Sequence, residues 1–227
     1  MVFVRIRQNN QWKDIRPKIY HNNKWQEAKT RIRQNGKWVD LVPPYVPTQR
    51  QTTWSATWTG GYWSEVHNNV LKPWTAVWSP DYPVQGSYNP FHDTWDWGNE
   101  GGMIGFDDGN IRWILSGARI DKVEVYLYSE HWAYRDGGQA VIGTHNHRGG
   151  RPGYFSEANH GVARARYTTR KQGQWITLPN WVGDNFKNNL LSGITVKADG
   201  TNIFQYGVFA RARDGWKAPK LRITYTK

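Results

Sequence analysis

Apolar and polar residues alternate along most of the chain after residue 51, which is the pattern of half-buried β-strands. In the segment "RIDKVEVYLYS", Val123, Val125 and Leu127 occupy every second position and therefore share one face of a strand. Similar short segments, bounded by turn residues, are "TTWSATWTG", "GVARARYTT", "QWITLP", "GITVKAD", "FQYGVFARA" and "KLRITYT". Their fairly even spacing predicts an all-β domain.

Two stretches have helical periodicity instead, "DDGNIRWILSG" and "PNWVGDNFKNNLLSG". Their apolar residues are Ile111, Ile114 and Leu115 in the first stretch, and Trp181, Phe186, Leu190 and Leu191 in the second. Each stretch ends at a glycine after its last apolar residue, as helices commonly do. Many strands with two short helices predict an antiparallel β-sandwich, jelly-roll-like, over residues 52–227.

The first 42 residues contain three similar segments, "RIRQNNQWKDI", "KIYHNNKWQEA" and "RIRQNGKWVDL". They begin at Arg5, Lys18 and Arg31, so the period is thirteen residues without slippage. The centre of each copy is Asn-Asn or Asn-Gly, residue types that tolerate the positive φ of a two-residue hairpin turn. Each copy is therefore predicted to be a short β-hairpin.

Folding each copy about its central pair fixes the predicted cross-strand register. The outer pairs are Arg5–Asp14, Lys18–Glu27 and Arg31–Asp40, and the inner pairs are Arg7–Trp12, Tyr20–Trp25 and Arg33–Trp38. Basic–acidic, cation–aromatic and aromatic pairs each stabilise a hairpin by about 0.2–1 kcal/mol. The inner pairs are our candidate assembly residues.

A hairpin this short is marginally stable alone, so another surface must cover it. It could belong to a small meander that packs against the rest of the chain, or to a stalk or attachment arm in which several copies share one core. We favour the arm. The segment "VPPYVPTQRQ" follows, with three prolines in five residues, and predicts an extended linker over residues 43–51.

Charge is concentrated in the arm. The net charge is +12, and residues 1–50 contain 11 Lys or Arg against 3 Asp or Glu. Such a segment could bind nucleic acid, an anionic polymer or an acidic neighbour in an assembly. Because the register places about half of these cations opposite acids or aromatic rings, we favour the neighbour. The charge is accompanied by neither a recognition-helix nor a zinc-finger pattern, so we expect no nucleic acid partner.

Two further absences in the sequence limit the class of protein. The chain has no cysteine, which excludes disulfides and cysteine-based zinc sites. It also lacks an apolar run approaching about 18 residues, so we expect no membrane insertion, and its N-terminus has no apolar signal core. We expect no cofactor.

Tryptophan is unusually abundant, with 15 in the chain, and seven of them lie between residues 54 and 97. Trp54 and Trp58 lie on an alternating strand and are predicted to be core residues. Prolines and polar residues surround the other candidates, which are Trp74, Trp78, Tyr82, Trp95 and Trp97. Flat aromatic faces bind the apolar side of sugars and also fill subunit contacts, so either a glycan or a neighbouring subunit could lie there.

The segment "GTHNHRGGRPG" carries the remaining candidates. Arg148 and Arg151 could bind phosphate or carboxylate groups of a wall polymer. His145 and His147 have the spacing that places two rings on one face of a strand, where they could bind a metal. The sequence offers no third ligand at a convincing spacing. We therefore favour His145 as a hydrogen-bonded residue at a strand end.

A hydrolase motif is absent from the sequence, and we expect no enzymatic activity. The adjacent aspartates Asp107 and Asp108 precede a predicted helix, where capping and the helix dipole explain an acidic residue. A glycosidase, however, needs only two carboxylates that the fold brings together. Wall or polysaccharide cleavage therefore stays a third hypothesis beside the two below.

The strings "GMIGFDDGNIRWILSGARIDKVEVYLYSEHWAYRDGGQAVIGTHN" and "QYGVFARARDGWKAPKLRITYTK" resemble the C-terminal domain of many minor tail or tail-fibre proteins of long-tailed bacteriophages. The shared features are an "IGFD" strand, a helix ending in "LSGA", a "VYLY" strand followed by "HW", a glycine pair before an "IG-H" strand, and a closing "P-L-I-Y" strand. The resemblance covers most of residues 100–227 and, more loosely, the arm. The segment "KPWTAVWSPDYPVQGSYNPFHDTWDWGNE" is longer and richer in tryptophan than that pattern.

The resemblance implies a protein of the virion, located in the tail: a non-enzymatic adhesin or fibre subunit that forms a homotrimer. Its partners would be other tail proteins and a polysaccharide of the host cell surface. The alternative is a purely structural tail or capsid decoration protein that binds no receptor. Sequence alone does not separate the two, because an aromatic residue that binds sugar and one that binds a neighbour are the same letter.

Overall fold

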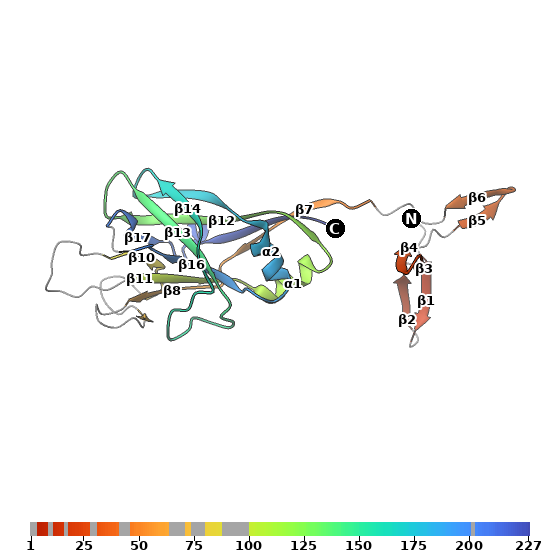
Figure 1. Ribbon diagram of the computed structural model, residues 1–227, viewed down its shortest axis with the longest axis horizontal. Coiled ribbons are helices and arrows are strands. Elements are labelled where there is room, and N and C mark those ends of the chain that lie inside the picture. The colour runs from red at the N-terminus through yellow and green to blue at the C-terminus, as the bar shows by residue number, and fades with distance from the viewer. Residues whose placement is uncertain are drawn as a thin grey trace. The chain divides into compact units, whose positions relative to one another are not determined.

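The computed structural model describes residues 4–8, 11–15, 18–27, 31–40, 46–63, 71–73, 80–87, 100–200 and 203–227 (Figure 1). The chain divides into two units, Met1–Pro47 and Thr48–Lys227. The second unit, which we call the head, is a β-sandwich, so the predicted fold class is confirmed.

The first unit consists of three separate two-stranded sheets. The strands are β1 (Val4–Gln8) with β2 (Gln11–Ile15), β3 (Lys18–His21) with β4 (Lys24–Glu27), and β5 (Arg31–Gln34) with β6 (Lys37–Asp40). All six predicted cross-strand pairs are present in the backbone register. Asn22, Asn23, Asn35 and Gly36 have φ between 50° and 77°, as a type I′ turn requires. The predicted Asn9-Asn10 turn lies outside the described residues.

The head contains two six-stranded antiparallel sheets. The first sheet has the order β7 (Gln49–Ser55), β18 (Lys220–Thr226), β12 (Arg119–Trp132), β15 (Gln172–Leu178). Strand β17 (Gly207–Phe209) pairs with the last residues of β12, on the same side as β18, and β10 (Val84–Gln85) pairs with β17. The second sheet has the order β14 (Asn159–Tyr167), β13 (Gly138–His145), β16 (Gly193–Lys197), β11 (Glu100–Gly105), β8 (Trp58–Trp63), β9 (Lys72–Pro73).

Eight of these strands follow jelly-roll winding. Along the chain β7, β11, β12, β13, β14, β15, β16 and β18 alternate between the two sheets at every step except β13 to β14. This produces the facing sets β7-β18-β12-β15 and β11-β16-β13-β14. The predicted jelly-roll-like arrangement is therefore present, with additional strands at the sheet edges.

The two helices lie close together at one end of the sandwich, which we call the helix end (Figure 1). Helix α1 (Asp108–Leu115) begins after Asp107, whose side chain accepts a hydrogen bond from the Asn110 backbone and so caps the helix. Helix α2 (Asn180–Lys187) ends before Leu190 and Leu191, earlier than predicted. None of the described helices is long and apolar enough to cross a membrane.

The early end of α2 is explained by Asn189, which has a φ of 64°. The Asn189 amide donates to the Phe186 carbonyl at 3.3 Å, and the Leu190 amide donates to the Asn185 carbonyl at 2.8 Å. These two bonds form a Schellman motif, in which asparagine takes the place of the usual glycine. Leu191 is still buried, but from the loop after the helix.

The predicted linker, residues 43–51, ends earlier than the proline pattern indicates. Strand β7 begins at Gln49, and the Thr48 and Lys227 backbones exchange hydrogen bonds of 3.0 and 3.1 Å. Lys227, directly after the last strand, supplies these hydrogen-bond partners. The pairing of β7 with β18 therefore continues toward the prolines. The head therefore begins before Thr52, at the helix end, where the Lys227 ammonium also donates to the Ile114 carbonyl.

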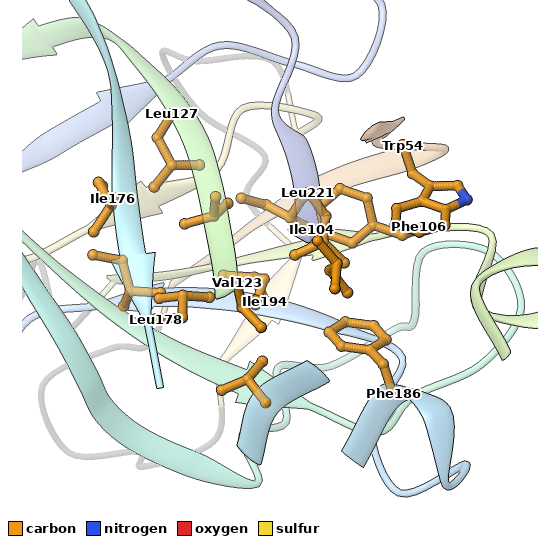
Figure 2. Packing of buried hydrophobic residues seen from close by; sticks show 14 of the residues in the cluster. Trp54, Ile104, Phe106, Val123, Leu127, Ile176, Leu178, Phe186, Ile194 and Leu221 are labelled. Atoms are coloured by element: carbon orange, nitrogen blue, oxygen red, sulfur yellow. The ribbon is translucent and has the colours of Figure 1, made fainter. Parts of the chain in front are cut away.

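The main core lies between the two sheets and under the helices (Figure 2). Ile104 and Ile194 from the second sheet meet Val123 and Leu221 from the first, and Phe186 of α2 closes the helix end. Trp54 is 8% exposed and belongs to this core, as its strand position predicts. The inward positions of the strands thus carry the apolar residues that the alternation predicts.

The opposite end, which we call the far end, contains β10, β17 and the 3₁₀ helix η1 (Ile203–Gln205). A fully buried tryptophan, Trp132, packs there against Tyr167 and Phe209, with ring centroids 5.3 and 5.6 Å away. A Cβ added to Gly138 would lie 2.1 Å from the Trp132 ring, and one added to Gly207 would lie 2.5 Å from it. The two glycines make room for the indole.

We predict that Gly138→Ala lowers the free energy of unfolding by about 1–3 kcal/mol, because a rigid buried ring cannot move away from the new methyl group. Denaturant unfolding of the full chain measures the change. Gly150→Ala is the matched control, since a Cβ at Gly150 meets open space. Equal stability of the two variants would contradict the packing described for Trp132.

Candidate functional site

The candidate sugar-binding segments start and end at the far end of the head or beside β8 and β9. Trp74, Trp78, Trp95 and Trp97 themselves lie outside the described residues. Segment 64–70 joins Trp63 to Leu71, and segment 88–99 joins Ser87 to Glu100. Trp63 and Glu100 are register partners, and Gly86 forms a β-bridge to Glu100. Segment 74–79 joins Pro73, opposite Tyr62, to Pro80, whose carbonyl accepts from the Gly61 amide.

Two predicted residues, Tyr82 and Arg151, meet in a cluster around Asp81. One carboxylate oxygen of Asp81 lies 3.7 Å from Arg151 Nη1, and the other lies 3.0 Å from Arg213 Nη2. The Arg211 guanidinium carbon lies 4.3 Å from the centroid of the Tyr82 ring. The fold thus brings Tyr82 and Arg151 together from segments about 70 positions apart in the sequence.

Arg151 is held mainly by the protein itself. Its side chain is 23% exposed and lies over Gly60, where a Cβ would be 2.9 Å from it. Its guanidinium carbon is 5.7 Å from the Tyr62 ring centroid. Burial raises the pKa of Tyr62 to about 12, so this phenol stays protonated and donates to the Pro152 carbonyl at 3.0 Å. Arg151 therefore anchors the loop 146–158 on the outer face of the second sheet.

The most accessible cation of the Asp81 cluster is Arg213, whose side chain is 63% exposed. Arg211 is bound to Asp214 by its Nε at 3.0 Å and its Nη2 at 2.8 Å. The cluster contains three guanidinium groups, those of Arg151, Arg211 and Arg213, and two carboxylates, those of Asp81 and Asp214. This excess of positive charge favours an acidic group as a ligand.

A buried carboxyl group, Glu100, lies at the far end, at the start of β11. Glu100 is 1% exposed, and its side-chain oxygens have no hydrogen-bond partner among the described residues. Burial raises the pKa of Glu100 well above its usual value, because it disfavours the charged form. Sequence reasoning missed this residue, because a glutamate at the start of a strand is ordinarily exposed.

Arg148 lies apart from Arg151, at the helix end. Its Nε is 3.3 Å from Asp108, and its Nη2 donates to the Asn189 carbonyl at 2.6 Å. Arg112 also pairs with Asp108, at 3.0 Å. Arg148 thus ties the loop after β13 to the start of α1 and the end of α2, whereas Arg151 pairs with Asp81.

His145 is the last residue of β13 and is fully buried. Its Nε2 bonds the Ile104 carbonyl at 3.0 Å, and its ring centroid lies 5.5 Å from Trp58. His147 is on the surface, and its Nε2 bonds the Gly150 carbonyl at 2.9 Å. No group of three or more metal-ligating side chains is placed to hold an ion anywhere in the described part of the chain.

Three aromatic side chains of the arm, Tyr20, Trp25 and Trp38, are largely exposed. Tyr20 and Trp25 pack with ring centroids 5.3 Å apart, yet they are 60% and 70% exposed. Trp38, opposite Arg33, is 66% exposed. The side chains of Arg7 and Trp12 lie outside the described residues, although their backbone positions are paired.

Sequence reasoning missed a row of aromatic side chains on the outer face of the first sheet. The row consists of Tyr126 and Tyr128 on β12, Trp175 on β15 and Trp216 in the 3₁₀ helix η2 (Gly215–Lys217). The signal was available, because the alternation that buries Val125 and Leu127 turns Tyr126 and Tyr128 to the other face. Trp175 could not be assigned to this row from the sequence, because its position depends on the register in which β15 pairs with β12.

Comparison with known proteins adds no assignment: no protein-family model matches the chain, and no curated protein matches it.

We predict that the head loses stability as the pH falls from about 6.5 to 4. Burial lowers the pKa of His145 to about 4, whereas an unfolded histidine has a pKa near 6.5, so the unfolded chain binds the proton first. This linkage costs about 2 kcal/mol at pH 5 relative to pH 7. Thermal unfolding of the full chain and of His145→Gln at both pH values tests it.

The wild-type chain should lose about 2 kcal/mol more than His145→Gln over this interval. A lower stability of His145→Gln at pH 7 does not affect the test, which compares the pH dependence of the two chains. Identical pH dependence would show that folding does not lower the pKa of His145.

Proposed function

We propose that the protein is a tail attachment protein of a long-tailed bacteriophage, non-enzymatic and trimeric, which assembles through its arm and contacts a host-surface polysaccharide through its head. The bacteriophage assignment is supported by the sequence resemblance of residues 100–227. The jelly-roll sandwich is compatible with that resemblance. It is an architecture that presents loops at both ends of a rigid scaffold.

The observation that carries the proposal is the polarity of the head. The chain enters the head at Thr48, which pairs with Lys227 and so belongs to the helix end. Segment 88–99, which contains Trp95 and Trp97, starts and ends at the opposite end. One end therefore continues into the basic arm, and the other carries a segment with two tryptophans. An attachment protein needs such a division between an assembly end and a contact end.

The arm supports the assembly part of the proposal. Its hairpins form separate two-stranded sheets, and Tyr20, Trp25 and Trp38 remain largely exposed. Burial of an aromatic side chain removes about 150–250 Å² from water. Three copies that share these rings would gain the core that one copy lacks.

We predict that the full chain is a trimer in solution and that Trp25→Ala with Trp38→Ala converts it to a monomer, because both changes remove exposed rings from the shared core. Light scattering after size-exclusion chromatography measures the mass. The control is Trp113→Ala, which removes a tryptophan of similar exposure, 76%, from the head. A monomeric wild-type chain would overturn the stalk, and the arm would then be a strap that docks on another virion protein.

We predict that particles carrying Trp74→Ala, Trp78→Ala, Trp95→Ala and Trp97→Ala together assemble normally but adsorb poorly to host cells. The reason is that these changes remove candidate sugar platforms and leave the arm intact. Particle yield and the rate of adsorption are measured separately. Failure of the particles to assemble would instead favour a structural protein without receptor binding.

A further inference from the structure

The outer face of the first sheet carries the aromatic row described above, Tyr126, Tyr128, Trp175 and Trp216, which we call the aromatic strip. Tyr126 and Trp175 lie directly opposite each other on β12 and β15, with ring centroids 5.4 Å apart. Trp216 packs edge-on against Tyr128 at 5.3 Å and is 67% exposed. Four rings thus extend across the sheet from β15 to η2.

Gly173 explains how Tyr126 lies across the neighbouring strand. A Cβ at Gly173 would be 2.0 Å from the Tyr126 hydroxyl oxygen, so a larger residue would displace the ring. Burial raises the pKa of Tyr126, and the phenol is therefore neutral. The strip is consequently a neutral row of rings on a hydrogen-bonded sheet, in which Tyr128 is 8% exposed, Tyr126 and Trp175 are half-buried, and Trp216 is the most exposed ring.

A cation accompanies each of the strip's sheet positions. The Arg222 guanidinium carbon lies 3.8 Å from the Trp175 ring centroid. The ammonium nitrogens of Lys220 and Lys217 lie 5.1 Å from the Tyr126 centroid and 4.7 Å from the Tyr128 centroid. These contacts hold the long cationic side chains along the strip.

Positive charge exceeds negative charge on this face. Glu124 accepts from Arg222 at 2.9 Å and pairs with Lys122 at 2.8 Å, and Glu130 pairs with Lys217 at 2.8 Å. Lys220 donates to the Trp216 carbonyl at 2.9 Å and forms no ion pair within the described part of the chain. Both carboxylates are thus engaged, while cationic donors remain available to a ligand.

We propose that the aromatic strip binds a polysaccharide that carries carboxylate or phosphate groups. This inference rests on the proposed function and names the class of its ligand. Aromatic faces bind the apolar side of sugar rings, and the neighbouring cations bind the acidic groups. A flat sheet face offers both kinds of contact in a row, as an extended polymer requires.

A second copy of this chain fits the strip less well. In a two-fold contact each copy presents the same patch, so the excess of cations on one strip would face the same excess on the other. Like-charge juxtaposition of this kind disfavours association. An acidic polymer has the complementary charge.

Calorimetric titration of the full chain tests the proposal with three polymers at about 150 mM salt, where long-range attraction to a basic protein is screened. Polygalacturonate offers carboxylates, a glycerol-phosphate polymer offers phosphates, and dextran is neutral. We expect binding to at least one acidic polymer and none to dextran. Trp216→Ala and Lys220→Ala should each weaken binding about tenfold, that is by about 1.4 kcal/mol.

Two matched controls separate the strip from the rest of the surface. Trp113→Ala removes another exposed tryptophan, and Lys227→Ala removes an exposed lysine at the helix end, and each should change the affinity less than about twofold. Equal effects of strip and control variants would overturn the proposal, as would the absence of binding to both acidic polymers. A change in the mass of Trp216→Ala in solution would also overturn it, because the strip would then be a subunit contact.

Particle adsorption distinguishes failure of this inference from failure of the proposed function. If wild-type particles need the protein to adsorb but the chain binds neither acidic polymer, the inference fails and the attachment function stands. If particles that lack the protein adsorb normally while the strip binds an acidic polymer in the titration, the attachment function fails and the strip keeps its ligand class.

Discussion

The fold of the head depends on the backbone pairing of one strand, β12. Its fourteen residues pair with β15 on one side and with β18 and then β17 on the other, so one register fixes four strands. A slip of one residue would turn Val123, Val125 and Leu127 out of the core and Tyr126 and Tyr128 into it. The register shifts at Ile120/Lys122 and Ser129/His131 adjust the two ends of the strand. The apolar alternation between these shifts therefore determines both the core and the composition of the outer face.

The arm follows a different principle, because almost everything that shapes it is local. The second and third hairpins each close through a turn of two residues and pair their backbones within about ten residues. Local pairing makes the backbone predictable from the repeat, but it produces separate two-stranded sheets that have no interior. Aromatic residues such as Trp25 then stay exposed in a single chain. The exposed rings are available to a partner surface, which is the basis of the assembly proposed above.

The sequence predicted those features that short periodicities encode. The hairpin register, the strand alternation and α1 with its aspartate cap were all predictable from neighbouring residues. The end of α2 was missed because an asparagine at residue 189 closes the helix where glycine was expected. The separation of Arg148 from Arg151 could not be predicted, since the loop between them turns from the helix end to Tyr62 and Asp81. Buried Glu100 and the partnership of Tyr126 with Trp175 likewise depend on long-range strand pairing.

The two faces of β12 show why a sandwich suits both stability and contact with a polymer. Inward residues are chosen by packing, which leaves them little chemical freedom. Outward residues must only tolerate an extended backbone, and at Tyr126 and Tyr128 they supply rings that stack with cations. The same hydrogen bonds that hold the core therefore hold the strip rigid. A ligand that binds the strip would lose little free energy to ordering of the protein. A binding surface of this kind needs no movable loop, and changes to its exposed members, such as Trp216, leave the core intact.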